Sequence, residues 1–302
     1  MKNIKWLIQS SGVNLNLHNE LWFARNVNYI DFGIIEFSNE ITNLSTIYQN
    51  WLDNPNTTYI MRGATKILKI LKDDAIYDNV PLLNKDFPNH DFSEFFSVLK
   101  NSIFYDHVKF DQAYYQQFDL PLLNKNAISI KTSEAKNMVF TEEKFVKPTS
   151  DGKAFVAKIL IPGETIENLI LSSRHNPSIW NETVLIAPIK RVVKEWRFFV
   201  LNGEVITGSQ YCENHIVNVK ELDDSIDDIN AINKAKEYAK LYMPSDLFTM
   251  DICLEENKDW SIVEYNCFNC SGLYKSNLLN LKNVVEEFIL NSHKNKNGYK
   301  KI

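Results

Sequence analysis

The dipeptide Asn202-Gly203 constrains the fold of this 302-residue chain more than any other short stretch. Both residues accept positive φ, and this pair is the strongest short-range signal for a tight β-hairpin. The runs on either side, Val192–Leu201 and Glu204–Tyr211, are rich in β-branched and aromatic residues, which favour strands. We therefore expect two long antiparallel strands joined at this turn.

The first strand of this hairpin has two chemically different faces. Side chains alternate along a strand, so Glu195, Arg197 and Phe199 share one face. The other face carries Lys194, Trp196, Phe198 and Val200. A charged pair among aromatic residues is more than a solvated face needs and favours a functional site, with an ordinary exposed antiparallel strand as the alternative.

A second hairpin is expected near the C-terminal end, from Phe248–Glu255 and Trp260–Asn266. It would place Asp251 beside the strand that carries Glu264 and Asn266, which share a face because they are two residues apart. Oxygen ligands of this kind suit a hard cation such as Mg²⁺. The alternative is a polar strand end that meets solvent.

The pattern in the rest of the chain predicts a mixed α/β protein. Residues 1–135 alternate short apolar strands with helical stretches such as Ala64–Leu71 and Phe92–Leu99. Asn79–Asp91, with two prolines, predicts a surface loop, and Leu278–Leu290 predicts a last helix. The expected domains are an N-terminal α/β lobe (1–135), a small subdomain (136–190), a large subdomain with the metal site (191–292) and a basic tail (293–302).

Composition excludes several classes of protein. Hydrophobic residues make up 44% and charged residues 24%, as in soluble globular proteins, and the net charge of -5 gives no general attraction to nucleic acid or anionic membrane. No apolar run approaches the roughly 20 residues that span a bilayer. Four cysteines without a secretion signal favour a cytoplasmic protein. The P-loop, dinucleotide, protein-kinase and G-x-S-x-G motifs do not occur.

The order of the remaining motifs resembles the ATP-grasp superfamily. The motifs are F-V-K-P, a glycine-containing turn, the apolar strand Val184–Ile189, E-W-R-F-F-V-x-N-G, an aspartate and V-E-Y-N, within Lys144–Tyr274. The end of the chain is similar to the R2K clade, whose signature matches Glu264, Asn266, Asn269, Ser271, Gly272 and Tyr274. The resemblance implies an ATP-grasp fold, an N-terminal α/β lobe followed by two α+β subdomains that clasp ATP.

The resemblance assigns nucleotide-binding roles. Lys147 would meet the α- and β-phosphates, and the backbone of Val184–Ala187 would pair with the adenine edge. The turn Thr149–Lys153 would cover the phosphates, but it has a single glycine, which makes the Lys153 side chain a candidate substitute. Arg197 would neutralise the transferring phosphoryl group, and Glu195 would orient this arginine or take part in metal binding.

The resemblance also implies a metal site and a substrate site. Asp251, Glu264 and Asn266 would hold Mg²⁺, with two ions expected. Arg62 follows a strand and precedes a helix, which makes it a candidate for docking an anionic carboxylate. The candidates for holding the acceptor or a phosphate are Ser271, Gly272 and Tyr274, with a plain helix cap as the alternative.

The function implied is an ADP-forming carboxylate-amine ligase that works through an acyl phosphate. Its substrate would be a peptide, a protein or an amino acid. Two alternatives stay open on the same fold, a phosphotransferase and an ATP-binding assembly factor that clamps a partner protein. Lys147 and Arg197 are the expected catalytic residues, because phosphoryl transfer depends on positioning and charge neutralisation.

Overall fold

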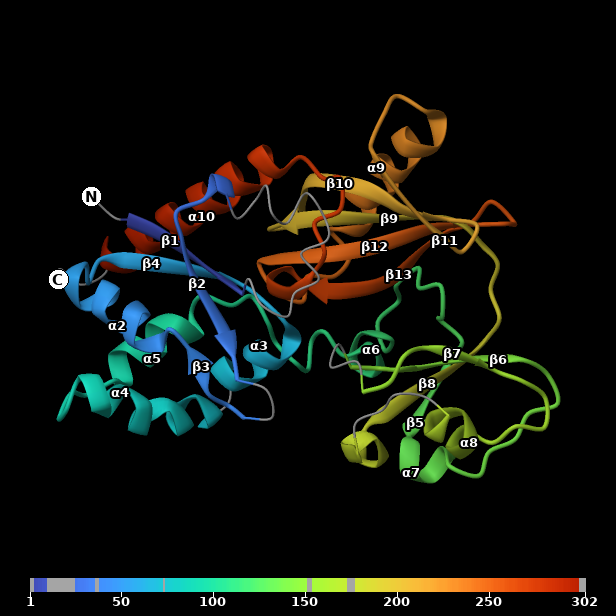
Figure 1. Ribbon diagram of the computed structural model, residues 1–302. Helices are drawn as coiled ribbons and strands as arrows, with labels where there is room; N and C mark the ends of the chain where they lie inside the picture. The colour runs from blue at the N-terminus through green and yellow to red at the C-terminus, as the bar shows by residue number, and fades with distance from the viewer. Residues whose placement is uncertain are drawn as a thin grey trace. The chain divides into compact units, whose positions relative to one another are not determined.

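The structure is a computed structural model. It describes residues 3–9, 25–35, 38–72, 74–150, 154–172 and 177–298. They fall into two compact units, one formed by Met1–Tyr105 with Phe268–Ile302 and the other by Asp106–Cys267 (Figure 1). Helices and strands alternate in both units, so the expected mixed α/β class is confirmed.

The first unit contains a four-stranded sheet in the order β3-β2-β1-β4. Its strands are β1 (Asn3–Gln9), β2 (Tyr29–Ile34), β3 (Ile41–Thr42) and β4 (Thr57–Arg62). Strand β1 is parallel to both β2 and β4, and parallel neighbours need a crossover between them. Helix α2 (Leu44–Asp53) lies on the crossover and buries Leu44, Ile47, Tyr48 and Trp51.

The helices of the first unit agree with the sequence in part. Helices α3 (Thr65–Lys72) and α5 (Ser93–Lys100) lie where they were predicted. The loop predicted over Asn79–Asp91 is wrong, because η1 (Asp74–Asn79) runs into α4 (Val80–Asp86). A proline stands in the first turn of α4, where its missing N–H costs no helical hydrogen bond.

Helix α10 (Leu278–Gly298) also belongs to the first unit and is longer than predicted. It extends through most of the segment 293–302 that the sequence suggested as a solvated tail, since no proline or glycine precedes Gly298 within it. The indole N–H of Trp6 in β1 donates to Glu286 Oε1 at 2.9 Å. This contact places α10 with the N-terminal strands rather than with the sheet that precedes it in sequence.

The second unit begins with α6 (Gln112–Tyr115) and contains a four-stranded antiparallel sheet in the order β5-β8-β6-β7. Its strands are β5 (Ile128–Lys131), β6 (Lys144–Pro148), β7 (Lys158–Leu160) and β8 (Thr183–Pro188). Around it lie α7 (Thr132–Ala135), α8 (Ile166–Leu171) and η2 (Pro177–Asn181). One face of the sheet is apolar and packs against α8 through Val146, Val184, Ile166 and Leu169.

A five-stranded antiparallel sheet completes the second unit, in the order β11-β10-β9-β12-β13. Its strands are β9 (Val192–Leu201), β10 (Glu204–Glu213), β11 (Ile216–Glu221), β12 (Leu247–Glu255) and β13 (Trp260–Cys267). Both predicted hairpins are confirmed, and Asn202 and Gly203 have φ of 49° and 80°. Helix α9 (Ile226–Tyr238) precedes β12, and η3 (Phe268–Cys270) follows β13.

The four domain boundaries expected from the sequence stay a prediction. Two elements group differently from those boundaries. Strand β5 pairs with β8 although it precedes residue 135, and the chain rejoins the first unit at Phe268. Both differences depend on pairing between distant segments.

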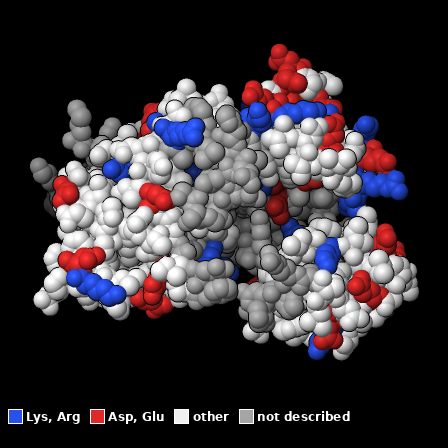
Figure 2. All heavy atoms as spheres, in the orientation of Figure 1, with Lys and Arg blue, Asp and Glu red and all other residues white. Residues whose placement is uncertain are grey.

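Charged side chains of both signs are interspersed over the visible face of the molecule, with acidic ones gathered over α9 (Figure 2). The residues around the start of this helix include Asp223, Asp224, Asp227 and Asp228. Within the described ranges, no helix has the length and apolar character that crossing a bilayer requires.

Candidate active site

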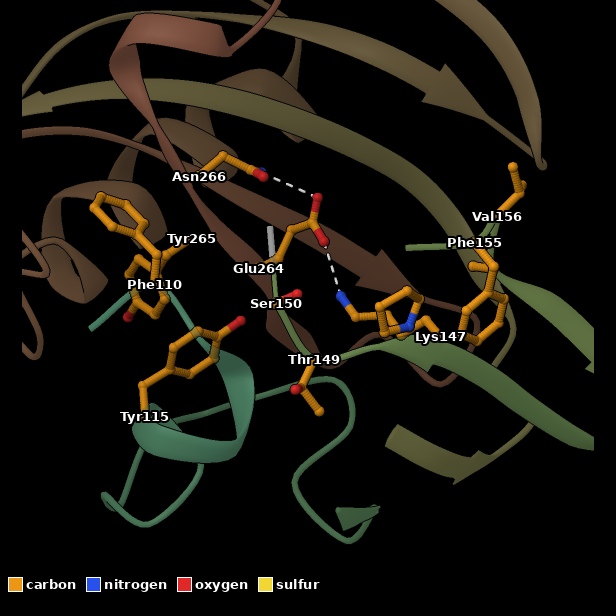
Figure 3. A pocket seen from close by; sticks show the side chains of 12 residues that line it. Phe110, Tyr115, Lys147, Thr149, Ser150, Phe155, Val156, Glu264, Tyr265 and Asn266 are labelled. Carbon is orange, nitrogen blue, oxygen red and sulfur yellow. Dashed lines mark hydrogen bonds and ion pairs between the residues drawn. The ribbon is translucent and has the colours of Figure 1, made fainter. Parts of the chain in front are cut away.

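Lys147 lies at the end of β6 and connects the two sheets of the second unit (Figure 3). Its Nζ donates to Glu264 Oε2 at 2.8 Å. The Lys147 side chain is 13% exposed, and that of Glu264 is 33% exposed. This ion pair is therefore sheltered but open to solvent on the carboxylate side.

The β12–β13 hairpin brings three oxygen-bearing side chains together, as the sequence predicted. Asp251 lies opposite Glu264 in the strand register. The Nδ2 of Asn266 donates to Glu264 Oε1 at 3.0 Å and to Asp251 Oδ2 at 3.4 Å. The amide thus joins the two carboxylates into one cluster.

Arg197 joins the same cluster from the neighbouring strand β9, where it lies opposite Asp251. Its Nε donates to Asp251 Oδ1 at 2.8 Å, and its Nη2 donates to Oδ2 at 2.7 Å. Two parallel charge-assisted bonds of this kind fix both partners. The Asp251 side chain is 1% exposed, so the pair is a buried ion pair.

Glu195, the other charged residue on this face of β9, bonds to Tyr211. The Tyr211 hydroxyl donates to Glu195 Oε2 at 2.6 Å. The Arg197 guanidinium lies over the Tyr211 ring, 5.7 Å from its centroid, a cation–π geometry. Glu195 therefore holds the Tyr211 ring in place against the Arg197 guanidinium.

The cluster shifts the pKa values of its two carboxyl groups in opposite directions. Burial acts to raise the pKa of Glu264, but the Lys147 ammonium and the Asn266 amide outweigh it and lower the pKa to about 2. Burial raises the pKa of Asp251, aided by the charges of Glu264 and Glu195 and opposed by Arg197. Glu264 is therefore the firmly ionised carboxylate at neutral pH.

Two cavities meet at the Lys147–Glu264 ion pair. The larger has a volume of about 630 Å³ and runs along Pro188–Val192, with Phe145, Lys158, Ile159 and Tyr211 among its other walls. The smaller, about 400 Å³, is lined mainly by aromatic and hydroxyl side chains (Figure 3). Lys147, Ala157 and Glu264 line both. Volumes of this size are typical of small-molecule sites.

Four basic residues line the larger cavity, Lys147, Lys158, Lys190 and Arg191. Among the described residues that line the smaller cavity, Lys147 is the one basic residue, and Glu264 is the one acidic residue. The larger cavity is also lined by the carboxylates of Glu195 and Glu264, so it has two more lysine or arginine side chains than carboxylates, whereas the described wall of the smaller cavity has one of each.

The predicted adenine-binding segment lies beside the larger cavity rather than in its wall. Val184 is buried within β8, where it pairs with Ile130 of β5 and with Pro148 of β6. The pairing with β5 ends at Ile186, and the cavity wall begins at Pro188. Ala187 is also buried and does not line the cavity.

The turn that follows Lys147 is described only in part. Thr149 and Ser150 line the smaller cavity, whereas Lys153 and Gly152 lie outside the described residues. The Thr149 hydroxyl donates to the Thr183 carbonyl at 3.2 Å, which ties the start of the turn to β8.

The four candidate substrate residues lie in the first unit. Arg62 is 6% exposed and donates to the carbonyls of Phe268 and Ser271, so this guanidinium holds the η3 segment in place. Ser271 is buried, Gly272 is partly buried, and Tyr274 has a positive φ of 49°. Their predicted role in substrate binding stays a prediction.

The aromatic wall of the smaller cavity was not predicted from the sequence. Phe110 and Tyr115 come from the segment that includes α6, and Tyr265 lies between two residues that were predicted as metal ligands. Aromatic residues that are far apart in sequence give no spacing signal. The one cue in the sequence was the unusual density of aromatic residues in F-D-Q-A-Y-Y-Q-Q-F.

The cluster can be compared with the needs of a divalent cation. No group of three or more His, Cys, Asp or Glu side chains in the described ranges is arranged to hold a metal ion. Asp251, Glu264 and Asn266 offer two carboxylates and one amide, which directs its Nδ2 at both carboxylates here and would present its oxygen to an ion after a half-turn of the amide. This donor set fits Mg²⁺, which binds few protein oxygens and takes its other ligands from phosphate and water.

A family model described as "ATP-grasp domain, R2K clade family 3" matches residues 108–287. The chain belongs to the ATP-grasp superfamily. The matched segment includes β6 with Lys147 and the whole five-stranded sheet, so the family resemblance in the sequence is confirmed. No curated protein matches the chain.

Several solved structures are similar to this ATP-grasp protein in fold. The ATP-grasp ligase PsnB complexed with a minimal precursor is 12% identical, with 90% of this chain and 92% of that chain covered and a TM-score of 0.44. The D-alanine-D-alanine ligase from Bacillus anthracis is 11% identical, with coverage of 94% and 92% and a TM-score of 0.48. The L-amino acid ligase from Bacillus licheniformis is 10% identical, with coverage of 88% and 68% and a TM-score of 0.46. Similarities at this level do not assign a substrate.

Proposed function

We propose that this ATP-grasp protein is an ADP-forming carboxylate-amine ligase that acts on a peptide, protein or amino-acid substrate. The observation that supports it most directly is the Lys147–Glu264 ion pair, which separates a basic cavity from an aromatic one. A ligase of this kind needs a nucleotide site and an acid site that meet at the transferring phosphoryl group. The shared ion pair is a suitable meeting point.

ATP would occupy the larger cavity. The four basic residues in its wall complement a polyphosphate, and the apolar residues Phe145, Ile159 and Ile189 offer contacts to a base. The stretch from Pro188 to Arg191 continues β8 beyond its pairing with β5, so we assign the adenine edge to this stretch instead of Val184–Ala187. In this arrangement Lys147 would exchange Glu264 for a phosphate oxygen.

The cluster of Asp251, Glu264 and Asn266 would hold Mg²⁺, and the bound ion would offset phosphate charge. Arg197 keeps Asp251 in place through its two hydrogen bonds and contributes a fixed positive charge close to the ion pair. We propose that Arg197 acts at the phosphoryl group from this position. Preorganised charges of this kind are the main means by which proteins catalyse phosphoryl transfer.

The reaction would proceed in two steps. An oxygen of the substrate carboxylate bonds to the γ-phosphorus of ATP, while the bond from that phosphorus to the bridging oxygen breaks and ADP leaves with the electron pair. The amine nitrogen then bonds to the carbonyl carbon of the acyl phosphate, phosphate leaves with its electron pair, and the amine proton passes to solvent. Neither step needs a covalent bond to the protein.

The test is incubation with ATP, Mg²⁺ and a pool of amino acids and short peptides, followed by nucleotide analysis and mass spectrometry. We expect ADP, phosphate and a product that has lost one water. Glu264→Gln should reduce ADP formation by about 10²- to 10³-fold, whereas Glu237→Gln, on the exposed side of α9, should not. Release of AMP, or full turnover by Glu264→Gln, would contradict the proposal.

A further inference from the structure

The smaller cavity combines a rigid aromatic wall with one inward-facing hydroxyl. Phe110, Tyr115, Phe155 and Tyr265 line it, and each is at most 3% exposed. The ring of Tyr115 packs edge-to-face against that of Tyr265, with 5.1 Å between centroids and an interplanar angle of 82°. Buried side chains that pack in this way hold their positions, so the wall is present before any ligand binds.

The hydroxyl of Tyr115 points into this cavity, toward Glu264 and Ser150 (Figure 3). A tyrosine hydroxyl carries one proton that it can donate to a ligand. The neighbouring hydroxyls of Thr149 and Ser150 already donate, to the Thr183 carbonyl and to Glu182 Oε2. Of the two tyrosine hydroxyls in the described wall, that of Tyr265 is buried without a hydrogen-bond partner, and that of Tyr115 is the one directed toward Glu264 (Figure 3). The Tyr115 proton is therefore the one placed to meet a carboxylate at the ion pair.

The protonation of Tyr115 suits a hydrogen-bond donor. Burial, together with the charge of Glu264, raises the pKa of its hydroxyl well above the ordinary value of 10.0. The group therefore keeps its proton at neutral pH. A buried proton that is not donated carries a desolvation cost, which a ligand acceptor would remove.

The charged side chains in their walls suit the two cavities to different ligands. The described walls of the smaller cavity carry one positive and one negative side chain, and these pair with each other. A polyanion or a second charged group would find no further partner in those walls, and its desolvation would be costly. An apolar group would find four aromatic rings.

From these observations we propose that the smaller cavity binds the acid to be activated through an apolar, preferably aromatic, side chain, and that the Tyr115 hydroxyl donates a hydrogen bond to its reacting carboxylate. This inference rests on the proposed ligase function for the chemistry but not for the binding. The carboxylate would lie at the shared ion pair, next to the phosphates, and the side chain would lie against Phe110 and Tyr265.

The first experiment measures binding without turnover. N-acetyl-L-phenylalanine, N-acetyl-L-alanine and N-acetyl-L-aspartate are titrated into the full chain, and affinity is followed by ligand-observed NMR. We expect the phenylalanine derivative to bind at least about tenfold more tightly than the aspartate derivative, a difference that burial of one aromatic ring can supply. Equal affinities, or no binding of any of the three, would overturn the inference.

The second experiment compares two tyrosines of one aromatic cluster. Tyr115→Phe removes only the inward hydroxyl, and we expect N-acetyl-L-phenylalanine to bind about 10-fold more weakly at an unchanged melting temperature. Tyr242→Phe is the matched control, because its ring packs 5.2 Å from that of Tyr265 but its hydroxyl donates to the Lys109 carbonyl. Unaltered acid affinity in Tyr115→Phe would refute the role of its hydroxyl.

The third experiment separates this inference from the ligase proposal. ATP, Mg²⁺ and hydroxylamine are added with each acid, since hydroxylamine converts an acyl phosphate to a hydroxamate and phosphate. Selective binding that is lost in Tyr115→Phe, with no hydroxamate from the wild type, would support the cavity assignment and refute the ligase. Hydroxamate formation without preference among the acids and with full activity in Tyr115→Phe would support the ligase and refute the cavity assignment.

Discussion

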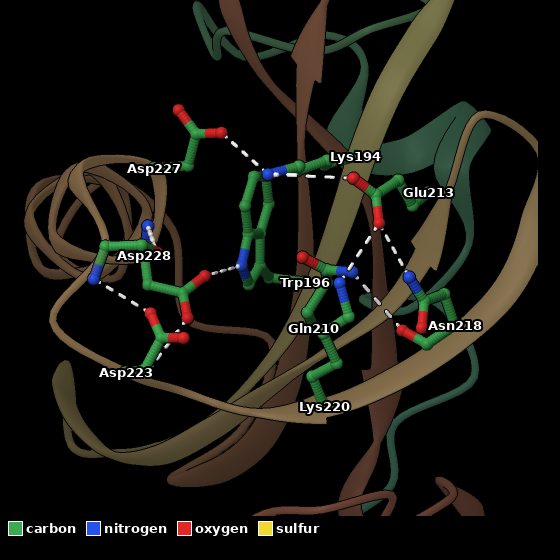
Figure 4. A network of polar contacts seen from close by, with 10 residues as sticks. Lys194, Trp196, Gln210, Glu213, Asn218, Lys220, Asp223, Asp227 and Asp228 are labelled. Atoms are coloured by element: carbon green, nitrogen blue, oxygen red, sulfur yellow. Dashed lines mark hydrogen bonds and ion pairs between the residues drawn. The ribbon is translucent and has the colours of Figure 1, made fainter.

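Strand β9 presents Arg197 to the candidate site on one face and Trp196 to helix α9 on the other, and polar groups surround it on both. On the α9 face, the Trp196 indole donates to Asp228 Oδ1 at 2.7 Å, and Lys194 Nζ donates to Asp227 Oδ2 at 2.7 Å (Figure 4). The second oxygen of Asp228 accepts from the Asp223 backbone at 2.9 Å. These contacts fasten the first turn of α9 to the sheet.

The site face uses similar groups but leaves space beside them. Its hydrogen-bonded series runs from Arg197 through Asp251, Asn266 and Glu264 to Lys147. It ends at two cavities, and none of the residues that fasten α9 lines either of them. Burial of polar groups is therefore not enough to identify a functional site in this protein. The candidate site of this protein lies where a series of hydrogen-bonded side chains ends at the two cavities.

The largest effect is expected from breaking the buried pair on the site face. Arg197→Met leaves the Asp251 carboxylate buried without its bidentate partner, and the free energy of unfolding should fall by about 3–5 kcal/mol. Urea denaturation measures the loss. The double variant Arg197→Met/Asp251→Leu should regain most of it, because an apolar pair replaces the ion pair. A single-variant loss below about 1 kcal/mol would show that the pair does not stabilise the fold.

A loss of activity without a large loss of stability is expected at Lys147, which ends the hydrogen-bonded series that begins at Arg197. Lys147→Met should reduce ADP formation by about 10²- to 10³-fold, because the cation shared by the two cavities is removed. The free energy of unfolding should change by about 1 kcal/mol or less, since the ion pair is partly exposed. Lys131→Met, on an exposed position of β5, is the matched control. A similar loss of activity in both variants would remove Lys147 from the site.

The opposite behaviour is expected on the α9 face. Asp228→Ala removes the acceptor of the buried Trp196 indole and of the Asp223 backbone N–H, so the free energy of unfolding should fall by about 1–3 kcal/mol. ADP formation by the folded fraction, measured at a temperature well below the transition, should match the wild type. A drop in turnover at full folding would mean that the two faces of β9 are coupled.

The smallest effect is expected for the pH dependence of the stability that Glu264 contributes on the site face. The folded pKa of Glu264 is about 2 and its ordinary value is 4.5, so the unfolded state takes up a proton first as the pH falls. The stability that Glu264 contributes is full above its ordinary pKa of 4.5 and is lost as the pH falls toward about 2. Because the side chain is one-third exposed, the contribution should be about 1 kcal/mol or less. Urea denaturation of wild type and Glu264→Gln from about pH 6 to about pH 3 should show a difference that narrows, and a difference independent of pH would contradict it.

The sequence predicted the hairpins and the cluster better than it predicted the walls of the site. Asn202-Gly203 indicated the register of the β9–β10 hairpin. The alternation of side chains was enough to place Arg197 and Trp196 on opposite faces of β9. The predicted loop over α4 failed because proline is read as a breaker but is also compatible with a first helical turn. The role of Val184–Ala187 at the adenine edge stays a prediction, and only strand pairing shows that β8 ends its pairing with β5 at Ile186, before the cavity wall begins at Pro188.

Local sequence determined the strands of this protein, the turn between β9 and β10, and the spacing that puts Glu264 and Asn266 on one face. Those features depend on backbone preference and on the two-residue repeat of a strand, which a linear sequence contains. Only the folded chain brings Lys147 to Glu264, places Arg62 against η3, and gathers Phe110, Tyr115 and Tyr265 around one cavity. Those contacts join residues far apart in the chain, and their free energy comes from packing and charge pairing, which exist only when the sheets have assembled.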